Sequence, residues 1–227
     1  MRSIVSGLAL LVISGSTAAL SLDDISQKDS TGGLKQALTQ GSIAAVAKLG
    51  KTDGFLGNPK VRIPLPESLQ KAEGLLRGLG LGKQADELVT TLNRAAEAAV
   101  PEAKTLLVNA VKQMSVQDAG SILTGGDDAA TQYFKRTTSG PLAERFLPIV
   151  KKATAKVKLA EKYNQYAEKA AKYHLIDESQ ANLDRYVTQK ALDALFLMIA
   201  EEERAIRQDP LGQASGLARK VFGAIGK

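Results

Sequence analysis

Apolar residues recur at intervals of three and four positions along most of the chain. Such spacing places them on one face of an α-helix. In the segment that follows Gly33 they are Leu34, Ala37, Leu38, Ala45 and Leu49. The alternating pattern of a β-strand is absent outside residues 61–65. The sequence therefore predicts an all-α fold, built as a single multi-helix bundle.

One long segment, residues 51–66, interrupts the helical pattern. It contains residues that are unfavourable in a helix interior; they are Gly54, Gly57, Pro59, Pro64 and Pro66. A residue that precedes a proline is pushed towards extended geometry, so residues 61–65 are expected to be extended. A non-helical segment of this length inside a compact domain is unusual and often functional. We expect residues 55–66 to form a strap across the core, with Phe55 beneath it.

Two later stretches carry local signals for helix ends. Ser115 and Asp118 have the spacing of a capping box, with aspartate in place of the usual glutamate. Asp127 or Asp128 is expected to cap the helix that follows. Pro148 is expected to kink the next helix or to begin a new one.

The N-terminus has the features of a secretory signal. Arg2 is positively charged, residues 8–13 are apolar, and residues 16–19 are small enough for cleavage after Ala19. The apolar run is short for a membrane span, although an uncleaved N-terminal anchor is the alternative. The expected organisation is a signal peptide at residues 1–19, a flexible segment at 20–32 and a single helical domain at 33–227.

The chain contains no cysteine. This excludes disulfides, thiolate metal ligands, a cysteine nucleophile and a lipid-modified cysteine anchor. A secreted chain of this kind depends on its hydrophobic core alone for stability. The single histidine, His174, excludes a histidine-based zinc site within one chain. We expect neither a metal nor a cofactor, because aspartates at helix starts are first explained by capping.

The formal net charge is +6, which favours anionic surfaces such as phospholipid headgroups. Nucleic acid is a poor partner, because the basic residues lack interleaved aromatic residues that would stack on bases. A lysine-rich stretch is expected to form a basic helix with Lys151, Lys158, Lys162 and Lys169 on one side. That side could contact an anionic membrane. The alternative is a solvated face, because the apolar side of this helix is mostly alanine.

The best candidates for a polar site lie on one predicted helix. Asn93 and Glu97 are four residues apart and share a face, with Arg94 beside them. In an alanine-rich helix these groups could face inward and join Asp118 and Thr131. A buried carboxylate there would be a functional candidate. The alternatives are a satisfied polar network or ordinary surface pairs.

A second polar pair lies towards the end of the longest predicted helix. Glu203 and Arg207 are separated by one helical turn. The simplest interpretation is a surface salt bridge that contributes about 0.3–0.5 kcal/mol. The functional alternative is that the guanidinium of Arg207 holds an anionic group or a partner's carboxylate.

Seven motifs together make the chain resemble a bacterial family known as domain of unknown function 4197. They are Gly33-Leu-Lys-Gln-Ala-Leu38, Ile63-Pro-Leu-Pro66, Asn93-Arg-Ala-Ala-Glu97, Met114-Ser-Val-Gln-Asp-Ala119, Ala129-Ala-Thr-Gln-Tyr-Phe134, Phe146-Leu-Pro-Ile-Val150 and Glu202-Glu-Arg-Ala-Ile-Arg-Gln-Asp-Pro210. The resemblance implies an exported helical protein of the cell envelope and no assigned chemistry. Many members look like lipoproteins, whereas this chain lacks the cysteine, which favours a free periplasmic protein.

The expected function is that of a periplasmic, non-enzymatic binding or interaction protein. The helices would enclose a groove partly covered by the strap, for an apolar or amphipathic ligand or an envelope partner. Its candidate ligand-binding residues are Phe55, Arg62, Asn93, Arg94, Glu97, Asp118, Thr131, Tyr133 and Arg207. One alternative is an enzyme with Glu97 and Asp118 as an acid/base pair. Another is a structural protein that dimerises through residues 183–206, whose apolar run at 196–199 needs cover from the domain or from a second chain.

Overall fold

The computed structural model describes residues 27–80, 82–177 and 180–209, together with Gly216, Arg219 and Val221. The predicted signal peptide and its cleavage site near Ala19 lie outside the described residues. Within the described ranges every regular element is a helix and there is no strand, which confirms the all-α prediction. None of the helices in these ranges is both long enough and apolar enough to cross a bilayer.

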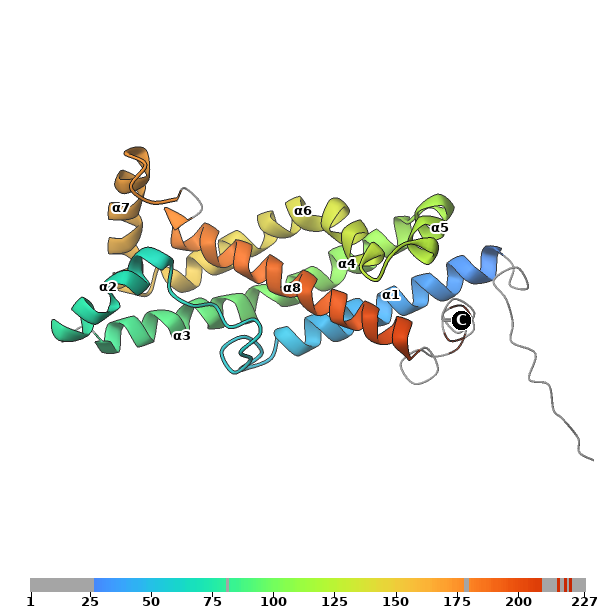
Figure 1. The fold of residues 1–227 in the computed structure, drawn as a ribbon, viewed down its shortest axis with the longest axis horizontal. Helices are drawn as coiled ribbons and strands as arrows, with labels where there is room; N and C mark the ends of the chain where they lie inside the picture. Colours follow the sequence, from blue (N-terminus) through green and yellow to red (C-terminus); the bar gives the residue numbers. More distant parts are fainter. Residues whose placement is uncertain are drawn as a thin grey trace, which may run out of the picture.

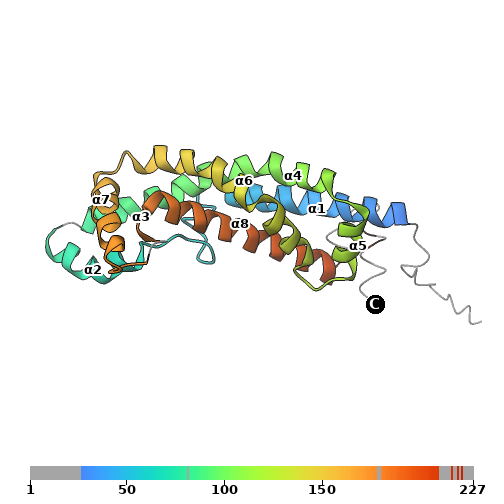
Figure 2. The same ribbon diagram turned by 90° about the horizontal axis from the view of Figure 1, so that it is seen from above.

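Long helices run lengthwise through an elongated bundle (Figures 1 and 2). The elements, in chain order, are α1 (Gln27–Leu49), α2 (Glu67–Gly78), α3 (Gly82–Ala99), the short 3-10 helix η2 (Val100–Glu102), α4 (Ala103–Gln113), α5 (Val116–Thr124), α6 (Ala129–Thr154), α7 (Lys158–Lys172) and α8 (Leu183–Gln208). Helix α8 packs against α6, α1 and α3. Helices α2 and α7 lie at one end of the bundle and α5 at the other (Figures 1 and 2).

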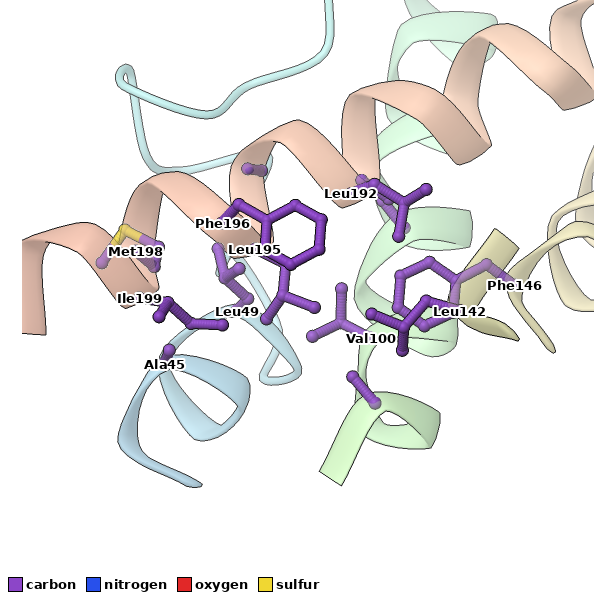
Figure 3. Close-up of a cluster of buried hydrophobic side chains, with 14 of the residues drawn as sticks. Ala45, Leu49, Val100, Leu142, Phe146, Leu192, Leu195, Phe196, Met198 and Ile199 are labelled. Atoms are coloured by element: carbon purple, nitrogen blue, oxygen red, sulfur yellow. The ribbon is translucent and has the colours of Figure 1, made fainter. Parts of the chain in front are cut away.

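The core is a single cluster of apolar side chains contributed by helices from the whole chain. Figure 3 shows part of it, where side chains of α1, η2, α6 and α8 meet between the helices. Phe134 and Phe146 of α6 and Leu195 of α8 are fully buried. Burying one side chain of this size contributes about 1.5–3 kcal/mol to the stability of the fold. In a protein without disulfides this burial is the main source of stability.

The first helix begins earlier than the sequence indicated. We expected the helical domain to start at Gly33, but α1 begins at Gln27 and Ser30 is already buried. Gly33 therefore lies inside a helix and not at its start. The apolar spacing that begins at Leu34 predicted only the part of α1 whose buried residues are apolar, because the buried residue of the preceding turn is the polar Ser30.

The prolines of α6 do not divide the helix. Of the two outcomes expected at Pro148, the start of a new helix is excluded, because α6 continues through both Pro141 and Pro148. A proline removes one backbone N–H and crowds the carbonyl four residues earlier. Both prolines are solvent-exposed, while Leu142, Phe146 and Val150 anchor the opposite face in the core. The affected carbonyls therefore lie on the side of the helix that water can reach.

The lysine-rich stretch is not one helix. Helix α6 ends at Thr154 and α7 begins at Lys158. Between them Val157 adopts extended geometry, with φ −110° and ψ 110°, and its side chain is buried. The prediction of one continuous basic face was wrong, because Lys151 lies on α6 whereas Lys158, Lys162 and Lys169 lie on α7.

Candidate functional site

The strap (residues 55–66) lies across α3 and α8, as Figure 1 shows. It contains no helix, and in residues 61–65 the side chains alternate between the core and the solvent. Val61, Ile63 and Leu65 are buried, whereas Arg62 and Pro64 are exposed. This alternation is that of an extended chain packed on one side.

Asn93 of α3 holds the centre of the strap from below. Its Oδ1 accepts a hydrogen bond from the Ile63 N–H at 2.8 Å, and its Nδ2 donates to the Ile63 carbonyl at 2.8 Å. The same Nδ2 donates to the Val89 carbonyl within α3. One fully buried amide thus satisfies both backbone groups of Ile63, which would be costly to bury unpaired.

Glu97, one turn further along α3, holds the start of the strap. Its Oε1 accepts from the N–H groups of Phe55 and Leu56 at 3.0 and 3.1 Å. Its Oε2 accepts from Arg94 at 2.6 Å, and Arg94 also binds Asp53 at 2.8 Å. Asp53 has a left-handed backbone with φ 63°, which turns the chain from α1 into the strap. The buried carboxylate therefore serves as a backbone anchor with each oxygen engaged.

Further contacts fix the outer part of the strap. The Tyr186 hydroxyl of α8 donates to the Pro64 carbonyl at 3.2 Å, and burial raises the pKa of this phenol. The Lys60 Nζ pairs with Glu201 of α8 at 2.8 Å. The strap is consequently held by hydrogen bonds or ion pairs at its start, its middle and its end.

Two clefts lie beside the strap. The first, here called the α3 cleft, has a volume of about 650 Å³ and is bounded by the strap, α2 and α3. The second, the α8 cleft, has a volume of about 210 Å³ and is bounded by the strap and α8. Arg62 and Pro64 line both clefts, because they project from the exposed side of the strap.

The α3 cleft combines charged and apolar side chains. Leu65 and Val89 contribute apolar surface, and Arg77 lines the cleft while paired with Asp86 at 2.9 Å. No carboxylate of the described residues pairs with the guanidinium of Arg62. The cleft can therefore offer a positive charge beside an apolar wall.

The polar residues that could have formed one network belong to two separate clusters. Asn93, Arg94 and Glu97 serve the strap, but Thr131 belongs to a different site around Glu203. The Glu203 carboxylate accepts from the N–H groups of Ala130 and Thr131 and from the Thr131 hydroxyl, all at 2.9 Å. The possibility that Asn93, Arg94 and Glu97 join Thr131 is not realised, and the alternative of a satisfied polar network describes the three residues on α3.

Arg207 completes the Glu203 cluster. Its guanidinium binds the Glu203 carboxylate at 3.0 Å and donates to the Ile122 carbonyl at 2.9 Å. The side chains of Arg207 and Glu203 are only 10% and 3% exposed. The expected surface salt bridge is thus a buried one, and it joins α8 to the start of α6 and to α5.

Asp118 and Tyr133 form hydrogen bonds with residues outside both clusters. The Asp118 carboxylate and the Ser115 hydroxyl close the predicted capping box of α5, which is confirmed. Hydrogen bonds from Ser115, and after them the nearby Arg136, hold the pKa of Asp118 below its usual value. The Tyr133 hydroxyl donates to the Ala110 carbonyl at 2.8 Å. Both residues therefore have structural partners.

The acid/base pair required by the enzyme alternative is not formed. The Glu97 carboxylate is bound by the strap backbone and Arg94, whereas the Asp118 carboxylate is bound by Ser115. The two side chains share no partner and belong to different parts of the bundle. Among the described residues no group of three or more His, Asp or Glu side chains is arranged to hold a metal ion.

Three functional side chains were missed or misjudged from the sequence. Asp53 precedes a glycine, and such a pair is a turn signal that could have suggested its left-handed backbone. Glu203 replaces an apolar residue in the stripe formed with Ile199 and Ile206, which could have suggested burial. No local signal points to the bond between Tyr186 and the strap.

The described residues form an all-helical bundle. In it, buried polar side chains bind the backbone of the proline-containing strap and, at a second site, the start of α6. The chain belongs to the family described as Protein of unknown function (DUF4197), whose model matches residues 24–223. This membership confirms the resemblance drawn from the seven motifs. Comparisons with curated proteins and with solved structures returned no match.

Proposed function

We propose that this protein is an exported, non-enzymatic binding protein of the cell envelope, and that the α3 cleft is its ligand site. The ligand is amphipathic, with an anionic group next to Arg62 and an apolar part along Leu65 and Val89. The single observation that carries the proposal is the position of Arg62. Its guanidinium has no acidic partner among the described residues and lines a cleft with an apolar wall.

The dimensions of the cleft support this proposal. Small-molecule sites generally have volumes of about 300–1,000 Å³ and combine apolar lining with a few polar groups. The α3 cleft has a volume of about 650 Å³ and lining of this mixed kind. A fatty acid or a lysophospholipid has the matching chemistry, because each joins an anionic head to an alkyl chain.

The anchoring of the strap supports binding by a preformed site. Asn93 and Glu97 fix the backbone on either side of Arg62. A segment that is already ordered loses little conformational freedom when a ligand binds, and this favours affinity. The two anchoring residues would act indirectly, by positioning Arg62.

The alternatives have less support from the contacts. An enzyme based on Glu97 and Asp118 lacks the juxtaposition of the two carboxylates. The apolar run at residues 196–199 supplied the motive for a dimer, but Phe196, Met198 and Ile199 are buried within the chain itself. Leu197 is the one member of the run that remains exposed.

Export is part of the proposal and has its own test. The sequence features of residues 1–19 support cleavage after Ala19 and release into the periplasm. N-terminal sequencing of the protein recovered from an envelope fraction should begin at Leu20. A chain that retains Met1 and stays with the cytoplasmic fraction would contradict export.

Isothermal titration calorimetry of the mature protein with dodecanoate tests ligand binding. Arg62→Ala should weaken binding by about 10- to 150-fold, because a charge-assisted hydrogen bond contributes about 1.5–3 kcal/mol. Arg145→Ala on α6 is the matched control, since Arg145 is exposed and does not line the cleft. Equal affinities for the two variants, or no binding by the unaltered protein, would exclude this site.

A further inference from the structure

Large apolar and aromatic side chains are exposed at the end of the bundle that contains α7. Tyr166 and Tyr173 are 70% and 77% exposed, and Leu175 in the following turn is 75% exposed. Tyrosine has an apolar ring and a polar tip, which suits the boundary between water and lipid. Helix α7 stands across the end of the bundle, where its outer face is not covered by the long helices (Figures 1 and 2).

Lysines accompany the two tyrosines on the same side of α7. Lys162, Tyr166 and Lys169 of α7 and its C-cap residue Tyr173 follow each other at intervals of four, three and four residues, so they form one stripe. The opposite side of the helix is buried through Ala160, Tyr163 and Ala167. At 100° per residue, Glu161 and Glu168 fall on the flank and not within the stripe.

A cleft of about 440 Å³ opens beside the last turn of α7. Lys172, His174 and Arg185 line it, and all three are exposed. Glu168, the acidic lining residue within the described part of the chain, accepts a hydrogen bond from Asn182 at 3.3 Å. The positive charges of Lys172 and Arg185, with the imidazole of His174 beside them, form a suitable place for a phosphate group.

The backbone of His174 occupies an unusual position. Its φ is 56°, and its N–H donates to the Ala171 carbonyl while the Leu175 N–H donates to the Ala170 carbonyl. These bonds form a helix C-cap of the type in which glycine has the least steric strain. A histidine is the less favourable residue for this backbone, but it adds a side chain to the lining of the basic cleft.

We propose that this end of the molecule docks on an anionic phospholipid surface. Tyr166, Tyr173 and Leu175 enter the headgroup region, while Lys162 and Lys169 interact with the negative surface. Basic residues near an anionic leaflet and tyrosines at its boundary are the two features that such binding requires. The basic cleft receives one headgroup phosphate.

This proposal is independent of the α3 cleft and differs from a contact made by lysines alone. The alanine side of α7, which is too small to insert, faces the core and has no part in it. The apolar contribution comes from the tyrosines on the exposed face. The stripe itself is the outer side of a helix, which suits a flat bilayer better than a peptide segment.

The experiment is co-sedimentation of the mature protein with vesicles of phosphatidylcholine containing phosphatidylglycerol. We expect binding that is lost on pure phosphatidylcholine vesicles and at high salt, because the charges become screened. The double substitution Tyr166→Ser and Tyr173→Ser should weaken binding about tenfold, as should Lys162→Glu with Lys169→Glu. The matched control is Lys151→Glu with Lys152→Glu on α6, which should leave binding within about twofold.

His174→Gly separates a binding role from a structural one. Glycine suits the left-handed backbone better, so the variant should unfold at a higher urea concentration. It should nevertheless bind the anionic vesicles several-fold more weakly. A variant that is more stable and binds equally well would remove His174 and its cleft from the proposal.

Other outcomes would overturn docking as a whole. Equal binding to neutral and anionic vesicles, or equal losses in the α6 control, would exclude recognition by the α7 stripe. Complete displacement by soluble glycerophosphate would identify a site for free phosphate esters. If the protein did not bind vesicles but formed a dimer that the tyrosine substitutions dissociate, the exposed tyrosines would belong to a protein interface. Arg62→Ala should leave vesicle binding unchanged, so failure of the two proposals can be distinguished.

Discussion

Glu203 caps the start of a helix to which Thr131 belongs, although the two residues are 72 positions apart in the sequence. The carboxylate accepts both the backbone N–H and the hydroxyl of Thr131 at 2.9 Å. Asp128 occupies the N-cap position of α6 but makes no side-chain capping bond. A residue of α8 therefore performs the role that local capping residues usually perform.

Substituting Glu203 with glutamine should be among the more destabilising changes in the protein. The change removes the Glu203 charge from beside the buried guanidinium of Arg207 and places an amide near the N–H groups of α6. Loss of one partner from a buried pair typically costs about 3–5 kcal/mol. Urea unfolding would measure it, with Glu202→Gln as the control, because the Glu202 pair with Lys48 is more exposed and should cost about 0–1 kcal/mol. Equal losses for the two variants would contradict a special role for Glu203.

Asn93→Ala should loosen the strap more than it disturbs the helices. The substitution leaves the N–H and carbonyl of Ile63 without their partner, which costs about 1–3 kcal/mol for each buried group. Limited trypsin digestion should then cut faster after Lys60 and Arg62. Asn109→Ala, at an exposed position of α4, should leave the digestion rate unchanged. A strap that stays protected in the Asn93 variant would show that other contacts suffice.

Glycine-to-alanine changes should have opposite effects at two positions. A Cβ at Gly54 would lie 2.3 Å from the Leu49 carbonyl oxygen, so Gly54→Ala requires backbone movement at the start of the strap. A Cβ at Gly120 would meet nothing within 4 Å, and Gly120 lies inside α5. Gly120→Ala should therefore stabilise the protein by about 0.5–1 kcal/mol. Thermal unfolding of both variants checks the opposite signs.

Alkaline pH should destabilise the fold partly through two tyrosines near the strap. Burial raises the pKa of Tyr163 and Tyr186 above the ordinary value of 10.0. Their contribution to stability is therefore complete below about pH 10 and is lost as the pH rises through the raised values. The double substitution Tyr163→Phe and Tyr186→Phe should flatten the fall in stability above pH 10, measured by urea unfolding. An unchanged slope would assign the fall to other groups.

The apolar spacing was sufficient to predict the helical class, because one buried stripe per helix is a local property of the sequence. The prolines likewise predicted a non-helical segment at 51–66. The extent of α1 and the continuity of α6 through Pro148 could not be predicted in this way. Both depend on which side of a helix faces the core, and this is decided by packing against other helices.

The candidate site was predicted in part. The spacing of Asn93 and Glu97 correctly placed both on one buried face of α3. Their partners are backbone groups of the strap, 30 to 42 residues away, and no local pattern specifies which buried amide meets which backbone group. The assignment of Thr131 to the same network failed for this reason.

The carboxylate that completes the first turn of α6 is synthesised 72 residues after that turn. At translation speeds of about 5–20 residues per second, Glu203 is added to the chain roughly 4–14 seconds after that turn has been synthesised. During this interval the contacts that Glu203 and Arg207 make between α5, α6 and α8 cannot form. Contacts that form only once α8 has been synthesised delay folding until most of the chain has been made, and such a delay suits a polypeptide that crosses a membrane unfolded.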